Sequence, residues 1–373
     1  MILNKIKDFA KSQAVLTAAM AAAVISCFFV HPDIKYLDYI DLKVISLLFC
    51  LMAVVAGLMK MNLFDIISHN IIRITSDMKK LTLFIVNITF FLSMFLTNDV
   101  ALIAVVPFTI GLFAQAGNKN LLKVIILETA AANLGSMLMP FGNPQNLYLY
   151  SHYDLAPGEF IMFLLPSAVL SIILVNISTL ILVPSQNIIS ESTGKTKIKD
   201  TRRFVIYILL FVLCVLTVLR VVSPLVCLCC VVTAVLMCDY KLLARVDYGL
   251  LATFAAFFIF VGNLTRIDFI SENISRIIGG NEFLCGLLLS QFISNVPAAI
   301  MLCEFTDNAR GLLLGVDIGG LGTIVASLAS VISYKYYLKT KNADSKSYIL
   351  GYLCLSAVFL IFLVTGVFIT KMN

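Results

Sequence analysis

The sequence predicts an all-α polytopic membrane protein with two inverted-topology repeats, each holding a re-entrant hairpin and a broken transmembrane helix. Three observations lead to this prediction. The chain has 373 residues, of which 60% are hydrophobic and only 13% charged, and its mean hydropathy is +1.00. Apolar runs near the roughly 20 residues that cross a bilayer recur along the chain. Short polar stretches interrupt several of these runs.

Uninterrupted apolar segments predict ordinary transmembrane helices. They cover 12–30, 43–60, 160–183, 204–221, 224–238, 248–263 and 348–370. No convincing cleavage site follows the first segment, so we expect a retained helix and not a removed signal peptide. Cys227, Cys229 and Cys230 share one of these helices with no histidine nearby, which favours small-residue packing over a metal or redox site.

The first interrupted run extends from Leu81 to Ala114 and carries one charge, Asp99, beside Thr97 and Asn98. It is too long for one crossing and too short for two crossings with a turn. We therefore expect a re-entrant hairpin at 81–114 with its polar tip inside the membrane. A broken helix at 122–152, interrupted by the sequence PFGNPQN, should follow.

The second half repeats this order. A hairpin is expected at 282–304, with SQFISNVP at its tip, and a broken helix at 311–338, with DIGGLGTIVASLAS at its break. Aligning Gly135 with Gly319 places Gly142-Asn143 opposite Ala326-Ser327, and Asn146 opposite Ser330. SHNIIRI (68–74) also reappears as SENISRI (271–277). The predicted domains are a first repeat at 1–183, a cytoplasmic linker at 184–203 and a second repeat at 204–373, whose extra helix at 204–221 inverts it.

Charge indicates the orientation. With the N-terminus in the cytoplasm, most of the 27 lysines and arginines fall on the inner side, as the positive-inside rule requires, and the C-terminus lies outside. The net charge of +6 is thus explained by topology and does not indicate nucleic acid. The amphipathic segments 61–77 and 264–278 are expected at the two interfaces, as connecting arms or as ordinary loop helices.

The interruptions carry helix-start residues, such as Asn143-Pro144, that could simply cap helices. At membrane depth, however, irregular backbone persists only within protein or beside a water-filled cavity. Helix N-termini there would direct partial positive charge at a bound anion. Asp99 costs about 2.5–3.5 kcal/mol at the bilayer centre, so it could ligate a cation, carry a proton or cap a helix. Glu128 and Glu304 are expected closer to solvated interfaces.

At these residues the sequence resembles the ion transporter superfamily, which includes citrate and divalent-anion/sodium symporters and arsenite permeases. TNDVALIAVVPF, GNPQN and SNVP have that family's order and spacing, over about 43–340. The resemblance implies a homodimer, a static scaffold and a moving transport domain. Dicarboxylate members carry Ser-Asn-Thr at both tips and Gly-Thr-Pro at the break. This chain has Thr-Asn-Asp, Ser-Asn-Val and Gly-Asn-Pro, and Asn-Asp is closer to the arsenite permeases.

The motifs and the resemblance together predict a cation-coupled secondary transporter of a small anion with elevator-type motion. The expected coupling ion is sodium or a proton, with no other cofactor, no metal beyond sodium, and the inner membrane as location. No lysine or arginine is expected at the midplane. The expected substrate-binding residues are Thr97, Asn98, Asn143, Pro144, Asn146, Ser294, Asn295 and Thr323. The expected cation-binding or coupling residues are Asp99, Asn98, Gly142, Asn295, Gly320 and Ser327.

Three alternatives stay open. The first is a proton-driven efflux permease for arsenite, another metalloid or an inorganic anion. The second is an ion channel, because re-entrant loops also build selectivity filters. The third, an intramembrane enzyme, would need a nucleophile–base pair or metal ligands at depth. The histidines, His31, His69 and His152, are all expected near the surface.

Overall fold

The computed structural model describes residues 14–61, 75–113, 116–187 and 200–371. Among these residues, eight helices are long and apolar enough to cross a membrane. The described chain is almost entirely helical, with one isolated β-bridge between Asp77 and Asn187. The predicted all-α polytopic membrane fold is therefore confirmed.

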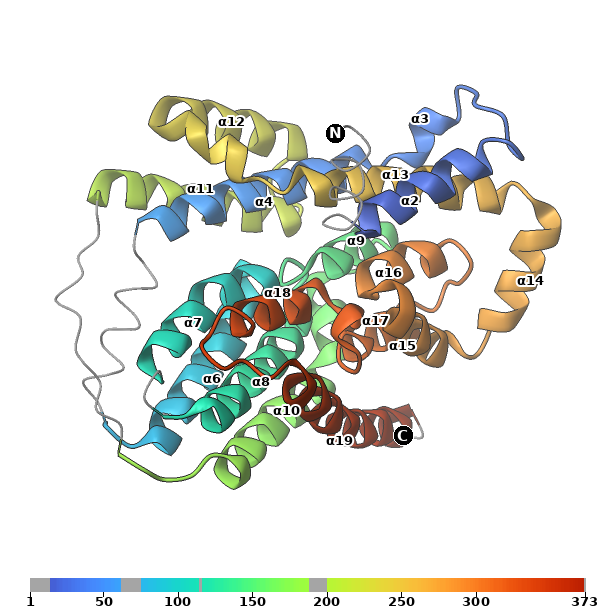
Figure 1. The fold of residues 1–373 in the computed structure, drawn as a ribbon. Helices are drawn as coiled ribbons and strands as arrows, with labels where there is room; N and C mark the ends of the chain where they lie inside the picture. Colours follow the sequence, from blue (N-terminus) through green and yellow to red (C-terminus); the bar gives the residue numbers. More distant parts are fainter. Residues whose placement is uncertain (1–13, 62–74, 114–115, 188–199, 372–373) are drawn as a thin grey trace, which may run out of the picture.

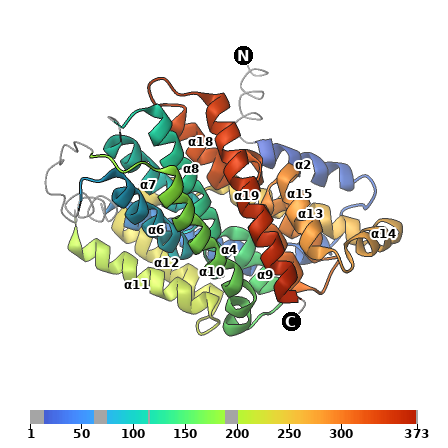
Figure 2. The same cartoon turned by 90° about the horizontal axis from the view of Figure 1, so that it is seen from below.

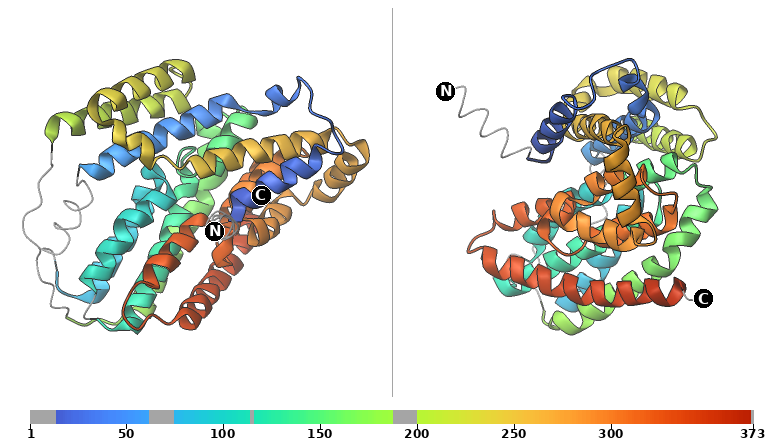
Figure 3. Two further views of the ribbon diagram at one scale, coloured as in Figure 1. Left: turned by 45° about the horizontal axis from the view of Figure 1, so that its top comes forward. Right: turned by 90° about the vertical axis from the view of Figure 1, so that its right-hand side faces the viewer.

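The helices form two layers (Figure 1). The upper layer contains α2 (Ala14–Ser26), α3 (Tyr36–Tyr39), α4 (Leu42–Lys60), α11 (Thr201–Val218), α12 (Pro224–Asp239), η2 (Tyr240–Arg245) and α13 (Tyr248–Thr265). The lower bundle contains α6 (Met78–Leu96), α7 (Asn98–Leu112), α8 (Asn118–Gly135), η1 (Ser136–Leu138), α9 (Pro144–His152), α10 (Pro157–Leu182), α15 (Glu282–Ile293), α16 (Asn295–Cys303), α17 (Ala309–Gly319), η3 (Ile324–Ala326), α18 (Leu328–Tyr337) and α19 (Ser345–Lys371). Figure 3 shows the layers from two further sides.

The lower bundle holds both interrupted regions. Helices α6 and α7 form one hairpin and α15 and α16 the other, while α8–α9 and α17–α18 are the broken helices. The long helices α10 and α19 lie against each other along the underside of the bundle (Figure 2). Each half of the chain thus contributes one hairpin and one broken helix. The opposite membrane orientation of the two halves stays a prediction.

Helix α14 (Asp268–Ile278) links the upper layer to the second hairpin at one end of the molecule (Figure 1). Phe269 and Ile277 are strongly exposed on it, and its sequence is amphipathic, as the segment 264–278 predicts. The corresponding first segment, 61–77, lies mostly outside the described residues, as does the first repeat copy at 68–74.

The upper layer packs mainly through apolar side chains of α4, which contacts both α11 and α12. Cys227 of α12 is buried with its Sγ 3.7 Å from that of Cys214 in α11, whereas Cys229 and Cys230 are exposed. At the α2–α3 loop, the Arg266 guanidinium lies 2.8 Å from Asp33 and lowers the pKa of that carboxyl group. This ion pair joins the end of α13 to the loop.

Each broken helix contains one glycine that lets it pack closely on the first helix of the hairpin in the same half of the chain. A Cβ on Gly135 would lie 2.1 Å from the Phe90 carbonyl oxygen of α6. A Cβ on Gly319 would lie 2.9 Å from the Leu287 Cα of α15. Both are backbone contacts that cannot yield by rotating a side chain, so the two breaks depend on glycine for the same steric reason.

Gly135→Ala should therefore destabilise the protein, by about 1–3 kcal/mol or more, because α8 must move away from α6. The measurement is the melting temperature of the purified protein in detergent. Gly111→Ala in α7 is the matched control, since its Cβ would meet nothing within 4 Å. The same melting temperature for both variants would contradict the close-packing account.

Candidate substrate and ion site

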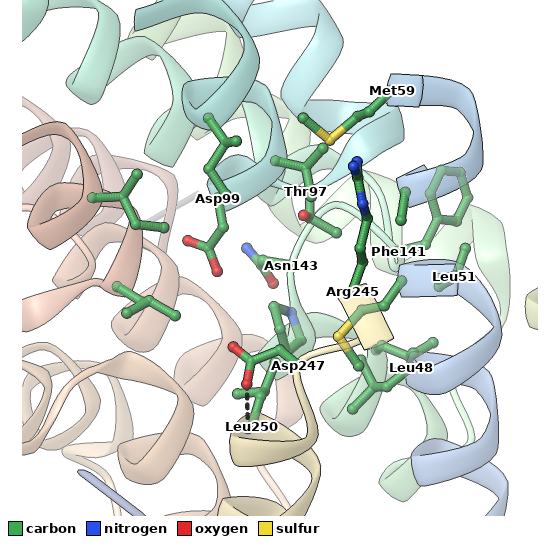
Figure 4. A pocket seen from close by; sticks show the side chains of 18 residues that line it. Leu48, Leu51, Met59, Thr97, Asp99, Phe141, Asn143, Arg245, Asp247 and Leu250 are labelled. Atoms are coloured by element: carbon green, nitrogen blue, oxygen red, sulfur yellow. Dashed lines mark hydrogen bonds between the residues drawn. The ribbon is translucent and has the colours of Figure 1, made fainter. Parts of the chain in front are cut away.

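A cavity of about 310 Å³ lies where the lower bundle meets the upper layer (Figure 4). Thr97 and Asp99 from the first hairpin, with Asn143 and Pro144 from the first broken helix, line it on the bundle side. The opposite side is formed by α4, with apolar residues such as Leu48, and by the segment between η2 and α13. Its size lies at the lower end of the range for small-molecule sites.

Both hairpins turn through one residue held in an unusual backbone conformation. Thr97 has φ 71° and ψ 149°, and Ser294 has φ 76° and ψ 154°. A positive φ is uncommon for residues other than glycine and is unfavourable for a β-branched threonine. In each hairpin the next residue is an asparagine whose Oδ1 accepts the backbone N–H that follows, at 2.9 Å for Asn98 and 3.0 Å for Asn295.

Asn133 joins the first hairpin to the second broken helix. Its Oδ1 accepts hydrogen bonds from Asn98 Nδ2 at 3.1 Å and from the Ser327 hydroxyl at 2.8 Å. Its own amide donates to the Ser330 hydroxyl at 3.0 Å. The backbone N–H of Asn98 also donates to the Gly142 carbonyl oxygen at 3.2 Å. The structure thus brings together three predicted cation-site residues, Asn98, Gly142 and Ser327.

Asp317 holds the first broken helix in place. Its Oδ1 accepts from Asn143 Nδ2 at 3.1 Å and from Gln145 Nε2 at 3.3 Å, while its buried Oδ2 has no partner among the described residues. Asn143 also caps α9, since its Oδ1 accepts the Asn146 backbone N–H at 2.9 Å. The predicted substrate residue Asn143 is therefore anchored by a carboxylate from the other half of the chain.

The remaining predicted residues support the two breaks. Asn146 donates from its side chain to the Met137 carbonyl oxygen, across the first break. Asn295 lies close to the second break, because a Cβ on Gly320 would be 3.0 Å from its Nδ2. The Ser294 hydroxyl faces the Ala326 carbonyl oxygen at 3.3 Å. Thr323 is bonded through both its backbone N–H and its hydroxyl to Gln291 of the second hairpin.

Asp99 is an acidic residue of the first hairpin and, unlike Asp317, it lines the cavity. Its Oδ1 is buried and has no hydrogen-bond partner among the described residues. Figure 4 shows its carboxylate directed toward Asn143 and toward Asp247 of the upper layer. One oxygen of this carboxyl group therefore has no hydrogen-bond donor among the described residues.

Sequence reasoning missed several residues of this site. Arg245 and Asp247, which no sequence pattern singles out, line the cavity from the upper layer. Asn133 was not singled out, although the alignment of Gly135 with Gly319 places it opposite Asp317. That alignment was the available signal. The acidic Glu128, expected near a solvated interface, is instead completely buried, so that expectation was wrong.

One other side-chain cluster lies apart from the cavity. His152, Cys303 and Glu304 bring one ligand atom each to within 4.8 Å of one another at the ends of α9 and α16. His152 Nδ1 is 3.6 Å from Glu304 Oε1, and the Cys303 thiol already lies 3.1 Å from the Tyr148 hydroxyl. His152 and Cys303 are 151 residues apart, so no local sequence pattern indicates this contact.

The bundle has two hairpins and two broken helices, and the first tip, the first break and the start of α18 line a small cavity. This architecture is typical of membrane transporters. The sequence profile of the citrate transporter family, CitMHS, matches residues 9–318. The chain belongs to this family. It is 35% identical over 301 residues to the uncharacterized transporter MJ0456 of Methanocaldococcus jannaschii, covering 79% of this chain and 81% of that protein. It is 31% identical over 299 residues to the inner membrane protein YbiR of Escherichia coli, covering 79% and 80%.

The cavity lining predicts which tip residue water can reach. Thr97 lines the cavity, whereas the next residue, Asn98, is only 4% exposed. A cysteine at Thr97 should react with a small aqueous thiol reagent about tenfold faster or more than one at Asn98, which needs local opening. Labelling would be followed by mass spectrometry with the exposed Cys229, Cys230 and Cys354 replaced by alanine. Equal rates at both positions would contradict the assigned cavity.

Proposed function

We propose that this protein is a cation-coupled secondary transporter of a small anion in the cytoplasmic membrane. The observation that carries the proposal is the convergence of helix N-termini with the unpartnered carboxylate of Asp99 on one cavity. Asn143 and Pro144 begin α9 at the cavity wall, and Thr97 precedes the start of α7. Such N-termini carry partial positive charge, which favours anions.

The cavity charges support coupling to a cation. Two carboxylates, Asp99 and Asp247, line it against one guanidinium, Arg245. With both carboxylates ionised, the cavity carries one excess negative charge, which opposes the entry of an anion. A sodium ion or proton bound beside Asp99 removes that opposition, so the cation and the anion bind more tightly together than singly.

The layering supports an elevator-type motion. Both hairpins and both broken helices belong to the lower bundle, whereas Arg245 and Asp247 belong to the upper layer. Movement of the bundle as a unit would carry the tips and breaks together. Contacts across the boundary include an aromatic one, in which the Tyr148 ring lies 5.2 Å from Phe258 and 6.3 Å from Phe254. Rings of this kind can slide past one another without leaving polar groups unpaired.

The experiment that tests the function is thermal stability of the purified protein across sodium, pH and an anion panel, with potassium as the ionic-strength control. A ligand that binds the folded state raises the melting temperature. We expect a sodium- or proton-dependent shift that one anion enlarges. Citrate, succinate, sulfate, phosphate and arsenite make up the panel. A shift with arsenite that depends on pH but not on sodium would favour the proton-driven efflux permease.

Asp99→Asn should abolish the cation-dependent part of this shift, because it removes the free carboxylate oxygen from the cavity. Asp38→Asn, on the exposed helix α3, is the matched control and should leave the shift unchanged. If the Asp99 variant keeps the same sodium and pH dependence as the unaltered protein, Asp99 does not bind the coupling ion.

Arg245→Gln should weaken anion binding while keeping the cation dependence. Loss of one charge-assisted hydrogen bond of about 1–2 kcal/mol corresponds to roughly a 5- to 30-fold higher anion concentration for half-maximal shift. The matched control is Lys241→Gln, an exposed residue of the same short helix outside the cavity. Equal effects of both substitutions would show that only the general surface charge matters.

A further inference from the structure

A second buried acid lies inside the lower bundle, outside the cavity. Glu128, on α8, is completely buried within a segment long and apolar enough to cross the membrane. The Thr109 hydroxyl of α7 donates a hydrogen bond to its Oε1. Its Oε2 is also buried and has no partner among the described residues. One oxygen is thus satisfied and the other is not.

No charged side chain of the described residues pairs with Glu128. Lys123, five residues earlier on α8, donates instead to the Leu182 carbonyl oxygen at the end of α10. The lysines of α6 and the glutamate of α10 lie in the first turns of those helices. An ionised carboxylate in this setting would have neither a counter-ion nor water to stabilise it.

Tyrosines are the titratable neighbours on the C-terminal side of the bundle. The hydroxyl of Tyr348, on α19, is buried in the bundle near Glu128 and Thr129 of α8. Its ring stacks on Tyr337 of α18, with centroids 5.0 Å apart, and on Tyr352 of α19, at 6.5 Å. Asp99, on α7, is ten positions from Thr109, about 15 Å along the helix.

These tyrosines lead to the polar network at the cavity. The Tyr352 hydroxyl is 2.7 Å from the Ser330 hydroxyl. Ser330 in turn accepts a hydrogen bond from Asn133, whose Oδ1 holds Asn98 and Ser327. The stacked rings of Tyr348 and Tyr352 thus connect the surroundings of Glu128 to the hydrogen-bonded group that positions the first hairpin tip and the start of α18.

We propose that Glu128 is a proton-binding site of the lower bundle, distinct from Asp99, and that it holds its proton on Oε2 in this conformation. The step transfers one proton from a hydronium ion of the solvent to the carboxylate, which leaves a water molecule and the neutral acid. The O–H so formed can donate to the Tyr348 hydroxyl, directly or through a water molecule. The Thr109 hydrogen bond to Oε1 is kept, because that atom becomes the carbonyl oxygen of the acid.

Burial gives this site a property that Asp99 lacks. Since Glu128 does not line the cavity, its proton can exchange with water only when the bundle opens or moves. Release of the proton would place an unpaired charge beside the tyrosines and disturb the network around Asn133. The use of this proton in coupling rests on the proposed transport function, whereas the protonation itself does not.

Infrared spectroscopy of the purified protein tests the protonation without any transport assay. A neutral carboxylic acid shows a C=O stretching band that ionised carboxylates lack, and carbon-13 labelling of glutamate shifts the glutamate bands while leaving Asp99 and Asp317 unshifted. We expect a labelled-glutamate acid band at neutral pH that is present in Glu159→Gln and absent in Glu128→Gln. No such band in the unaltered labelled protein would overturn the proposal.

Stability and transport give the second measurement. Glu128→Gln imitates the neutral acid in shape, so it should keep the melting temperature at neutral pH and remove the pH dependence of that temperature that Glu128 contributes.

In proteoliposomes Glu128→Gln should lower the number of protons moved per anion, whereas Glu159→Gln should leave this number unchanged. A variant that loses its folded state at neutral pH would show that the ionised form is required, against the proposal. If the infrared band behaves as expected but no coupled flux is measured, the proposed function is rejected and the protonation of Glu128 stands.

Discussion

The structure depends on how backbone polar groups are satisfied where helices stop inside an apolar bundle. Two hairpin tips and two broken helices expose N–H and C=O groups where lipid offers no hydrogen bonds. Short side chains at each interruption meet this demand. The Asn143 oxygen caps α9, the Ser327 hydroxyl caps α18, and the oxygens of Asn98 and Asn295 accept the first N–H groups of α7 and α16.

Because the side-chain oxygens of these asparagines accept backbone N–H groups, their amide nitrogens remain to donate hydrogen bonds to other helices. Asn98 directs its Nδ2 to Asn133, and Asn143 directs its Nδ2 to Asp317. Each asparagine thus fixes a helix start with one atom and ties it to another helix with the other. Asn133 and Asp317, which accept these two hydrogen bonds, occupy corresponding places two residues before Gly135 and Gly319. Asn133 is a neutral amide, whereas Asp317 is an acid whose Oδ2 has no partner among the described residues. The two halves therefore share a geometry while differing in the chemical group at this position.

Sequence reasoning predicted the interruptions because each one breaks an otherwise apolar run, a local signal that needs no knowledge of contacts. Thr97, Ser294 and the breaks at Gly142 and Gly320 all stand where that signal placed them. The residues that this local signal missed matter because they contact residues far away in the sequence. Asn133 matters because Asn98 and Ser327 converge on it, and Ser327 is 194 positions away. Glu128 resembled an interfacial acid in sequence, and only the packing of α7, α18 and α19 around α8 shows its burial.

The division of charge between the layers has a mechanical consequence for the proposed function. In an elevator movement Asp99 would travel with the bundle, whereas Arg245 and Asp247 would stay on the upper layer. The cavity would then have all three charges only when the layers meet as they do here. After an elevator movement the bundle keeps its helix N-termini and Asp99 but faces another part of the upper layer. The anion would then lose the guanidinium while the cation kept its carboxylate. Unequal affinities on the two sides would follow from a single arginine, without any change in the tips or breaks that form the core of the site.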